Sequence, residues 1–90
     1  MEKPKFPLGQ VVITPAAQSA IPDVEVRTAL NRHVAGDWGD LGEADKAENE
    51  LSLKEGFRLL SSYCASDGTK FWIISEADRS VTTILLPDDY

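Results

Sequence analysis

Seven carboxylates lie close together in the middle of the chain and are its most distinctive chemical feature. They are Asp37, Asp40, Glu43, Asp45, Glu48, Glu50 and Glu55. The segment 37–55 contains only two bases, so seven acids against two bases give it a net charge of −5, out of −6 for the whole chain. Such a run usually forms the solvated face of a helix, but a concentrated field of one sign also attracts a partner of opposite charge. Both interpretations stay open at this point.

Two further features could take part in binding a partner. Trp38 is predicted to pin the linker after the second helix to the core, and it is also the best candidate for the aromatic anchor of an interface. The turn 76–80 either satisfies its own polar groups, with Asp78 bonded to the backbone at Ser80, or directs Arg79 toward a carboxylate of its own or of a partner. The residues predicted to bind a partner are Asp37, Trp38, Asp40, Glu43, Asp45, Glu48, Asp78 and Arg79.

Catalytic and metal sites have weaker support in the sequence. His33 is the only histidine and precedes Asp37 by four residues, so a His–Asp contact could orient a general base. A histidine at the end of a helix more often complements the helix dipole. One histidine and one cysteine, Cys64, cannot form a zinc site, and the spacing of the carboxylates does not match a calcium-binding loop. We predict no catalytic residue, metal site or cofactor, with a small enzyme or metal-binding protein centred on His33 and Asp37 as the alternative.

Hydrophobic periodicity and capping residues predict the elements that position these side chains. The expected helices cover residues 15–20, 23–35 and 43–55, and the expected strands cover residues 10–14, 57–66, 69–76 and 80–86. Short turns join the last three strands, and Asp67-Gly68 is a strong hairpin signal, so these strands should form a meander with 69–76 in its centre. The predicted fold class is α+β, with an antiparallel sheet of three or four strands and two or three helices packed on one face.

Composition sets further bounds on the protein. Ninety residues of 9.9 kDa suffice for one domain, in which residues 1–7 are expected to form a flexible tail. The longest apolar run, 71–74, is too short to span a membrane, and the N-terminus lacks the apolar region of a signal peptide. A single cysteine fits a reducing cytoplasm. The net charge of −6 argues against direct binding of nucleic acid, which needs Lys and Arg to neutralise phosphates.

Two motifs together resemble a family of short bacterial proteins encoded by plasmids, phages and integrated elements, which are often called plasmid-related proteins. Residues 32–41 read RHVAGDWGDL, and residues 76–90 read EADRSVTTILLPDDY. The resemblance covers roughly Phe6 to Tyr90 and implies an accessory protein of a mobile genetic element, without implying an activity. Some members are labelled as subunits of type I restriction enzymes, but this chain is too short for a methyltransferase domain and has no glycine-rich cofactor loop.

These observations favour a non-enzymatic, cytoplasmic interaction protein of a mobile genetic element. Its acidic segment would bind a basic surface on a host protein that handles nucleic acid in defence, and would inhibit that protein by charge complementarity. No membrane partner is expected. A structural homodimer is a further alternative: the run Phe71–Ile74 is apolar on both faces, which leaves part of the sheet exposed and available for self-association.

Overall fold

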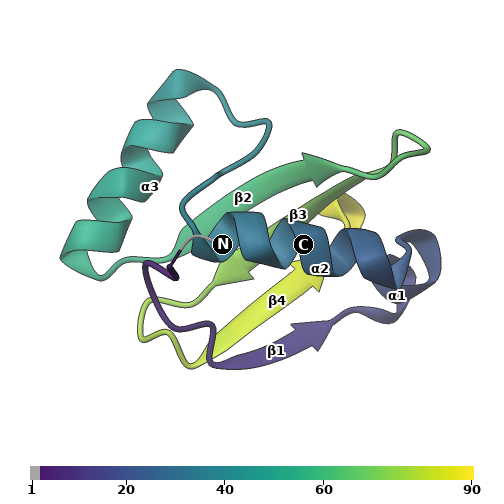
Figure 1. Cartoon of the computed structure of the whole chain (residues 1–90), viewed down its shortest axis with the longest axis horizontal. Helices are drawn as coiled ribbons and strands as arrows, with labels where there is room; N and C mark the ends of the chain where they lie inside the picture. The colour runs from purple at the N-terminus through teal and green to yellow at the C-terminus, as the bar shows by residue number, and fades with distance from the viewer. Residues whose placement is uncertain (1–2) are drawn as a thin grey trace.

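A mixed four-stranded sheet forms the centre of the computed structural model, which describes residues 3–90 (Figure 1). Its strands are β1 (Gln10–Ile13), β2 (Leu59–Cys64), β3 (Lys70–Ser75) and β4 (Val81–Leu85), in the spatial order β1-β4-β3-β2. The antiparallel β2–β3 and β3–β4 pairs form the predicted meander, whereas β1 pairs with β4 in parallel. The α+β class is confirmed. The sheet is mixed because only a short hairpin forces neighbouring strands to be antiparallel, and a long connection separates β1 from β4.

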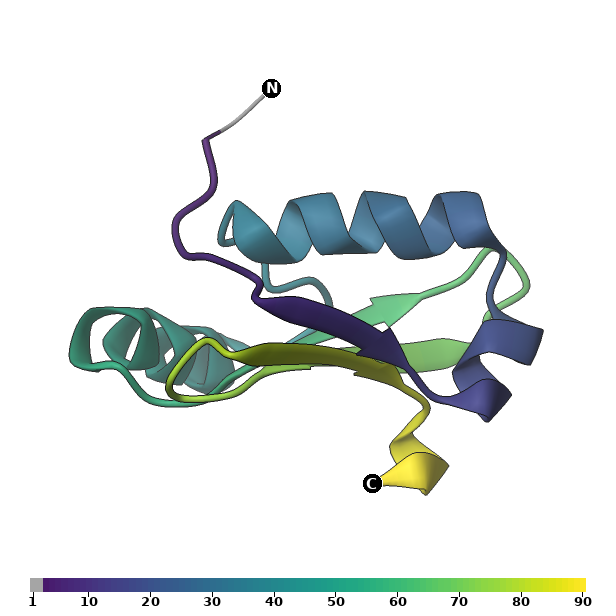
Figure 2. The same cartoon turned by 90° about the horizontal axis from the view of Figure 1, so that it is seen from below.

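The helices begin and end within one residue of the predicted positions. They are α1 (Pro15–Ala20), α2 (Asp23–Val34) and α3 (Glu43–Glu55), and a 3₁₀ turn, η1 (Pro87–Asp89), follows β4. Figure 2 shows that α2 alone lies across one face of the sheet, while α3 lies to the side and η1 projects from the opposite face. Of the two or three helices expected to pack on one face, only α2 lies across it. No helix of the described residues is long and apolar enough to cross a bilayer.

The position of α3 follows from its composition. Its buried side chains, Asn49 and Ser52, are polar, so the helix has no apolar stripe wide enough to cover a sheet face. It packs instead beside β2, with Leu53 as its partly buried apolar contact to the core. This arrangement leaves the acidic side chains of α3 in solvent and the sheet face opposite α2 partly open.

The core consists of two apolar clusters. The larger lies between α2 and the sheet and contains Ala17, Ile21, Ala29, Tyr63, Ala65, Phe71, Ile73 and Ile84. The smaller contains Phe6, Trp38 and Leu59. Because Phe6 is buried and the Lys5 amide donates to the Val34 carbonyl at 2.8 Å, the prediction of a flexible tail is wrong at these positions. Residues 1 and 2, which belonged to that predicted tail, lie outside the described part of the chain.

The outer edge of β2 is covered by two separate segments. The Ser62 amide donates to the Trp38 carbonyl at 3.2 Å, and the Ser62 carbonyl accepts from the Asp40 amide at 2.7 Å. The Asn49 side chain then pairs with Leu60 as a strand would, donating to its carbonyl at 2.6 Å and accepting from its amide at 3.2 Å. Unpaired backbone groups on an edge strand invite association, and here the linker after α2 and one side chain of α3 satisfy them.

Gly39 allows the linker after α2 to approach and pair with the backbone of β2. A Cβ at Gly39 would lie 2.0 Å from the Ser62 carbonyl oxygen, and the backbone φ of Gly39 is +76°. We expect Gly39→Ala to lower the free energy of unfolding by about 2 kcal/mol, through backbone strain and a displaced edge. Gly42→Ala is the matched control, since a Cβ there meets nothing within 4 Å. Urea unfolding measures both, and equal stability of the two variants would contradict this account of the edge.

Candidate functional site

A groove of about 550 Å³ lies on the sheet face opposite α2, between α3 and the end of the chain. The alternation of strand side chains explains its floor: Leu60 and Ser62 of β2 and Trp72 of β3 project to the same face. One wall comes from α3 and the loop before it. The other consists of Arg58 and Tyr90. The groove therefore combines a floor of mixed apolar and polar side chains, to which Lys70 of β3 also belongs, with an acidic wall and an aromatic wall.

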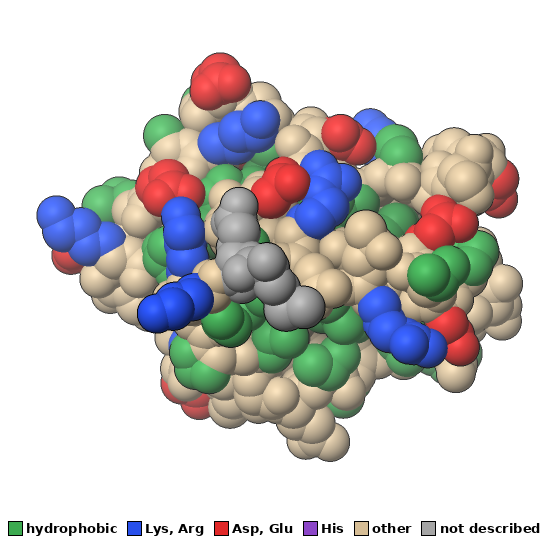
Figure 3. Space-filling view, in the orientation of Figure 1, with side chains coloured by type: hydrophobic (Ala, Val, Ile, Leu, Met, Phe, Trp, Pro, Cys, Tyr) green, Lys and Arg blue, Asp and Glu red, His purple; other side chains and the backbone are tan. Residues whose placement is uncertain are grey.

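The acidic wall consists of Asp40, Asp45 and Glu48, whose side chains are exposed. Within residues 3–90 the ion pairs are Arg32–Asp37 and Arg58–Glu76, so none of the three wall carboxylates has a cationic partner there. No group of three or more histidine, cysteine, aspartate and glutamate side chains in that range is placed to hold a metal ion. The wall thus presents negative charge to solvent. On the α2 face, by contrast, acidic and basic side chains are interspersed (Figure 3).

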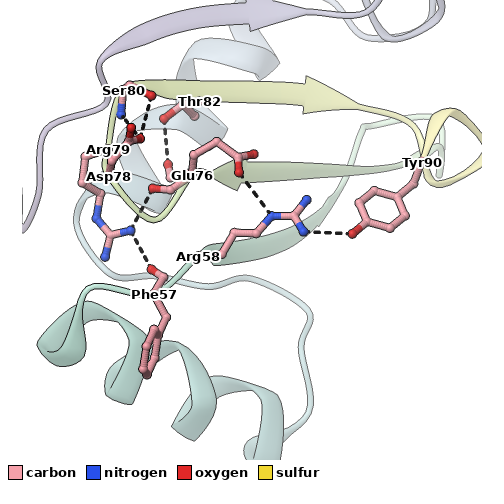
Figure 4. A network of polar contacts seen from close by, with 9 residues as sticks. Phe57, Arg58, Glu76, Asp78, Arg79, Ser80, Thr82 and Tyr90 are labelled. Atoms are coloured by element: carbon pink, nitrogen blue, oxygen red, sulfur yellow. Dashed lines mark hydrogen bonds and ion pairs between the residues drawn. The ribbon is translucent and has the colours of Figure 1, made fainter.

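The aromatic wall is held in place by Arg58. Its Nη1 donates to the Tyr90 hydroxyl at 3.0 Å, and its Nε lies 3.7 Å from Oε1 of Glu76 (Figure 4). The Tyr90 ring packs edge-on against Trp72, with 5.9 Å between the ring centroids, and remains 68% exposed. Because Glu76 pairs with Arg58, the positive charge of that guanidinium is partly neutralised. The Arg58 guanidinium also lies over the Tyr90 ring, with 5.5 Å between its central carbon and the ring centroid. The partly exposed Trp72 ring beside it can pack against a further cationic group.

Three of the predicted partner-binding residues, Asp40, Asp45 and Glu48, come together at this groove. Glu43 is exposed on α3 but does not line it. Asp37 lies outside the groove and is already paired: Arg32 Nε and Nη2 donate to its two carboxylate oxygens at 2.8 and 3.2 Å, and the Gly39 amide donates to it at 3.2 Å. The Arg32 hydrogen bond lowers the pKa of Asp37. We therefore assign Asp37 to the end of α2 rather than to binding.

Trp38 is a core residue, as its predicted role of pinning the linker requires. Only 3% of it is exposed, its ring stacks on Phe6 with 6.4 Å between centroids, and its Nε1 donates to Oε2 of Glu50 at 2.7 Å. The prediction that Trp38 is the aromatic anchor of an interface is wrong, because no ring face is available to a partner. The aromatic side chains that line the groove are instead Trp72, which is partly exposed, and Tyr90, which is exposed.

The turn at Asp78 and Arg79 satisfies its own polar groups. Asp78 accepts hydrogen bonds from the amide and the hydroxyl of Ser80 at 3.0 and 2.6 Å. Arg79 points inward and donates to the carbonyls of Phe57 and Glu76 at 2.6 and 3.0 Å (Figure 4). It also donates to the Ser52 carbonyl at 3.2 Å. The interpretation of a turn that satisfies its own polar groups is therefore confirmed, and neither Asp78 nor Arg79 lines the groove. The Arg79 guanidinium is hydrogen-bonded to carbonyls at the end of α3 rather than to a carboxylate. It thereby connects that helix to the β3–β4 turn.

His33 is fully buried and does not contact Asp37. Its Nδ1 is hydrogen-bonded to the Ser61 hydroxyl and its Nε2 to the Ser75 hydroxyl at 3.0 Å. Thr82 donates to the Leu8 carbonyl at 2.7 Å. Because Thr82 uses its one hydroxyl proton in that bond, Ser75 must donate its own proton to Thr82. Ser75 can therefore only accept from the N–H at Nε2 of His33. The Nδ1 atom of the neutral ring then accepts from the Ser61 hydroxyl.

This hydrogen-bond chain corrects both interpretations of His33. Burial, with a smaller contribution from Arg79, lowers its pKa to about 4. The imidazole is consequently neutral near pH 7 and adds no charge to the helix end. Nor can it act as a general base with Asp37, because it faces neither that carboxylate nor the groove. His33 instead links α2 to β2 and β3 through the interior.

Sequence reasoning missed Arg58, Lys70 and Tyr90 as residues of the groove. The Asp67-Gly68 turn carried a usable signal for Lys70, because it fixes the β2–β3 register and so places Lys70 beside Cys64, two residues from Trp72. Nothing in the sequence indicated that Tyr90 packs on Trp72. No family model, curated protein or solved structure matches the chain, so the assignment of function depends on the groove itself.

Proposed function

We propose that the protein is a non-enzymatic interaction protein that binds a basic segment of a partner protein in the groove between α3 and Tyr90. The observation that carries the proposal is the arrangement of Asp40, Asp45 and Glu48 along one wall, three carboxylates that form no ion pair within residues 3–90. Lys and Arg side chains of a partner would pair with these carboxylates, and their aliphatic stems would pack on Trp72 and Leu60.

The shape of the groove favours a protein segment over a small cation. The wall carboxylates come from the loop before α3 and from successive turns of the helix, so they are spread along the groove rather than converging on one point. A segment with several basic side chains can meet them in sequence. Exposed carboxylates also steer a basic partner toward the site over a distance of about 8–10 Å at physiological salt.

A nucleic-acid-handling protein fits this chemistry well. Its phosphate-binding surface carries Lys and Arg spaced to meet a row of negative charges, and the acidic wall offers such a row. The resemblance of two sequence motifs to plasmid and phage proteins favours a host protein of the defence machinery as that partner. Occupation of its phosphate-binding surface would then inhibit it.

Charge reversal in the groove tests the proposal, with an arginine-rich peptide as the probe. We expect the double variant Asp45→Lys with Glu48→Lys to weaken binding by about tenfold or more, or about 1.4 kcal/mol. The matched control is Glu43→Lys with Glu55→Lys, which changes the net charge equally on the same helix but outside the groove. Isothermal titration calorimetry measures both affinities.

The control decides between a site and a general attraction. If both double variants lose affinity equally, the peptide responds to net charge alone and the groove is not the binding site. We also expect the wild-type affinity to fall as salt is raised, because exposed charges are screened. An affinity that does not change at high salt would contradict charge complementarity.

A further inference from the structure

No segment within residues 3–90 pairs with the outer edge of β1. In Figure 1 no other element lies beyond this strand, and Val11 and Val12 are 43% and 37% exposed. The ladder to β4 uses the backbone of alternate residues: the Gln10 amide donates to Ser80 and the Thr14 amide to Ile84. The N–H and C=O groups of Val11 and Ile13 therefore point away from β4.

The outward-facing backbone groups at the two edges of the sheet differ in their hydrogen bonding. Residues 38–40 and the Asn49 side chain satisfy the backbone of β2. At β1 the described residues provide no hydrogen-bond partner for the outward groups of Val11 and Ile13. The strand also lacks the lysine, proline or bulge that commonly protects an edge. An open, uncharged, apolar edge in a chain that covers its other edge indicates a surface used for pairing.

The pattern of polar and apolar residues in β1 and the following Thr14 is the same in both directions. Residues 10–14 read Gln-Val-Val-Ile-Thr, with a polar residue at each end and three β-branched residues between. Antiparallel pairing about Val12 places Val11 opposite the partner's Ile13, and Gln10 opposite the partner's Thr14. In this register Val11 and the partner's Ile13 exchange both N–H···O=C bonds. Apolar side chains meet apolar ones, so the strand is complementary to a second copy of itself.

Electrostatics permit this contact despite the net charge of −6. The strand carries no charge, and the shallow hollow beside it is flanked by one acid and one base of α2, Asp23 and Arg27. The carboxylate of Asp89, near Thr14, already accepts hydrogen bonds from Thr14 and Leu86. A second copy approaching β1 therefore avoids the acidic segment, which lies by the opposite edge of the sheet.

We propose that two copies of the chain associate through β1 in antiparallel fashion, forming one continuous sheet about a twofold axis at Val12. The contact is made by the edge of the sheet, and so differs from the dimer through the sheet face considered from the sequence. Because this axis is perpendicular to the sheet, both copies of α2 lie on one face and both grooves on the other. The dimer would thus present two acidic grooves on the same side, which raises the avidity for a partner with two basic segments.

Sedimentation equilibrium from micromolar to millimolar concentration tests the dimer. We expect the mass of the wild type to rise from 9.9 kDa toward twice that value. Two variants should stay monomeric: Val12→Lys, which places like charges on the axis, and Val11→Pro, which removes an outward N–H but no bond to β4. The matched control Leu51→Lys adds the same charge at an exposed residue of α3 and should dimerise as the wild type does.

Each result has a defined meaning. Circular dichroism shows whether each variant keeps the fold, and the conclusion is drawn from the variants that do. A wild type that stays at 9.9 kDa at millimolar concentration overturns the dimer. Dimerisation of folded Val12→Lys or Val11→Pro with unchanged affinity overturns the β1 edge as the contact. An increase of about tenfold or more in the dissociation constant of either variant, with Leu51→Lys unchanged, supports it. None of these outcomes depends on whether the groove binds a basic peptide.

Discussion

Replacing Trp38 with alanine is expected to lower the free energy of unfolding by about 3–5 kcal/mol, the cost of deleting a large aromatic side chain from a core. Trp38 holds the smaller cluster together through Phe6 and Leu59, packs edge-on against His33 at 5.8 Å, and donates to Glu50 of α3. Its loss would leave a cavity where the linker, α3 and the N-terminal segment meet. Urea unfolding followed by far-ultraviolet circular dichroism measures the change.

Trp72→Ala is the control for this prediction. Trp72 is only partly buried and lies at the groove, so its removal should cost less stability than the removal of Trp38. Trp38→Phe should give an intermediate loss, because it keeps an aromatic ring but deletes the indole N–H that bonds Glu50. A larger loss for Trp72→Ala than for Trp38→Ala would contradict the assignment of Trp38 to the core and of Trp72 to the groove.

Acidification is expected to destabilise the protein through His33. Its pKa is about 4 in the folded protein against 6.5 ordinarily, so between these values the unfolded chain binds a proton that the folded chain does not. Stability is therefore complete above pH 6.5 and falls as the pH is lowered toward 4, by a total of about 3 kcal/mol. Urea unfolding at a series of pH values measures this loss.

A variant without the imidazole isolates the contribution of His33. His33→Gln keeps a side chain that both donates and accepts hydrogen bonds, but should show no such loss of stability between pH 6.5 and 4. The carboxyls of Asp37, Asp67, Asp78 and Asp89 have lowered pKa values. Their stabilisation is lost mostly below their ordinary pKa of 3.8, so most of that loss lies below this window. An unchanged slope in His33→Gln would show that another group titrates there.

Local signals in the sequence were sufficient to predict the three helices and the approximate positions of the four strands, but not the 3₁₀ turn η1. The Thr14-Pro15 start of α1 is confirmed by a hydrogen bond from the Ala17 amide to the Thr14 hydroxyl, and the predicted end of α3 by the left-handed backbone of Gly56. These features depend on residues within one turn of each other. The parallel pairing of β1 could not be predicted in this way, because it depends on the path of a connection that spans most of the chain.

The candidate site was predicted only in part, for a related reason. The charge run contains the three carboxylates that line the groove, Asp40, Asp45 and Glu48, since charge density is visible in the sequence. It did not reveal that Trp38 turns inward, because exposed and buried tryptophans have the same local pattern. Proximity in sequence was also misleading for His33 and Asp37: the histidine points toward Ser61 and Ser75, which follow it by 28 and 42 positions.

The central claim, that a basic segment binds in the groove beside Trp72, can be tested with the two tryptophans themselves. Each gives one indole N–H signal in the nuclear magnetic resonance spectrum of ¹⁵N-labelled protein: Trp72 at the groove, and Trp38 in the core and bonded to Glu50. Titration with an arginine-rich peptide should shift the Trp72 signal progressively and leave the Trp38 signal in place. A peptide that binds without moving the Trp72 signal would contradict the claim.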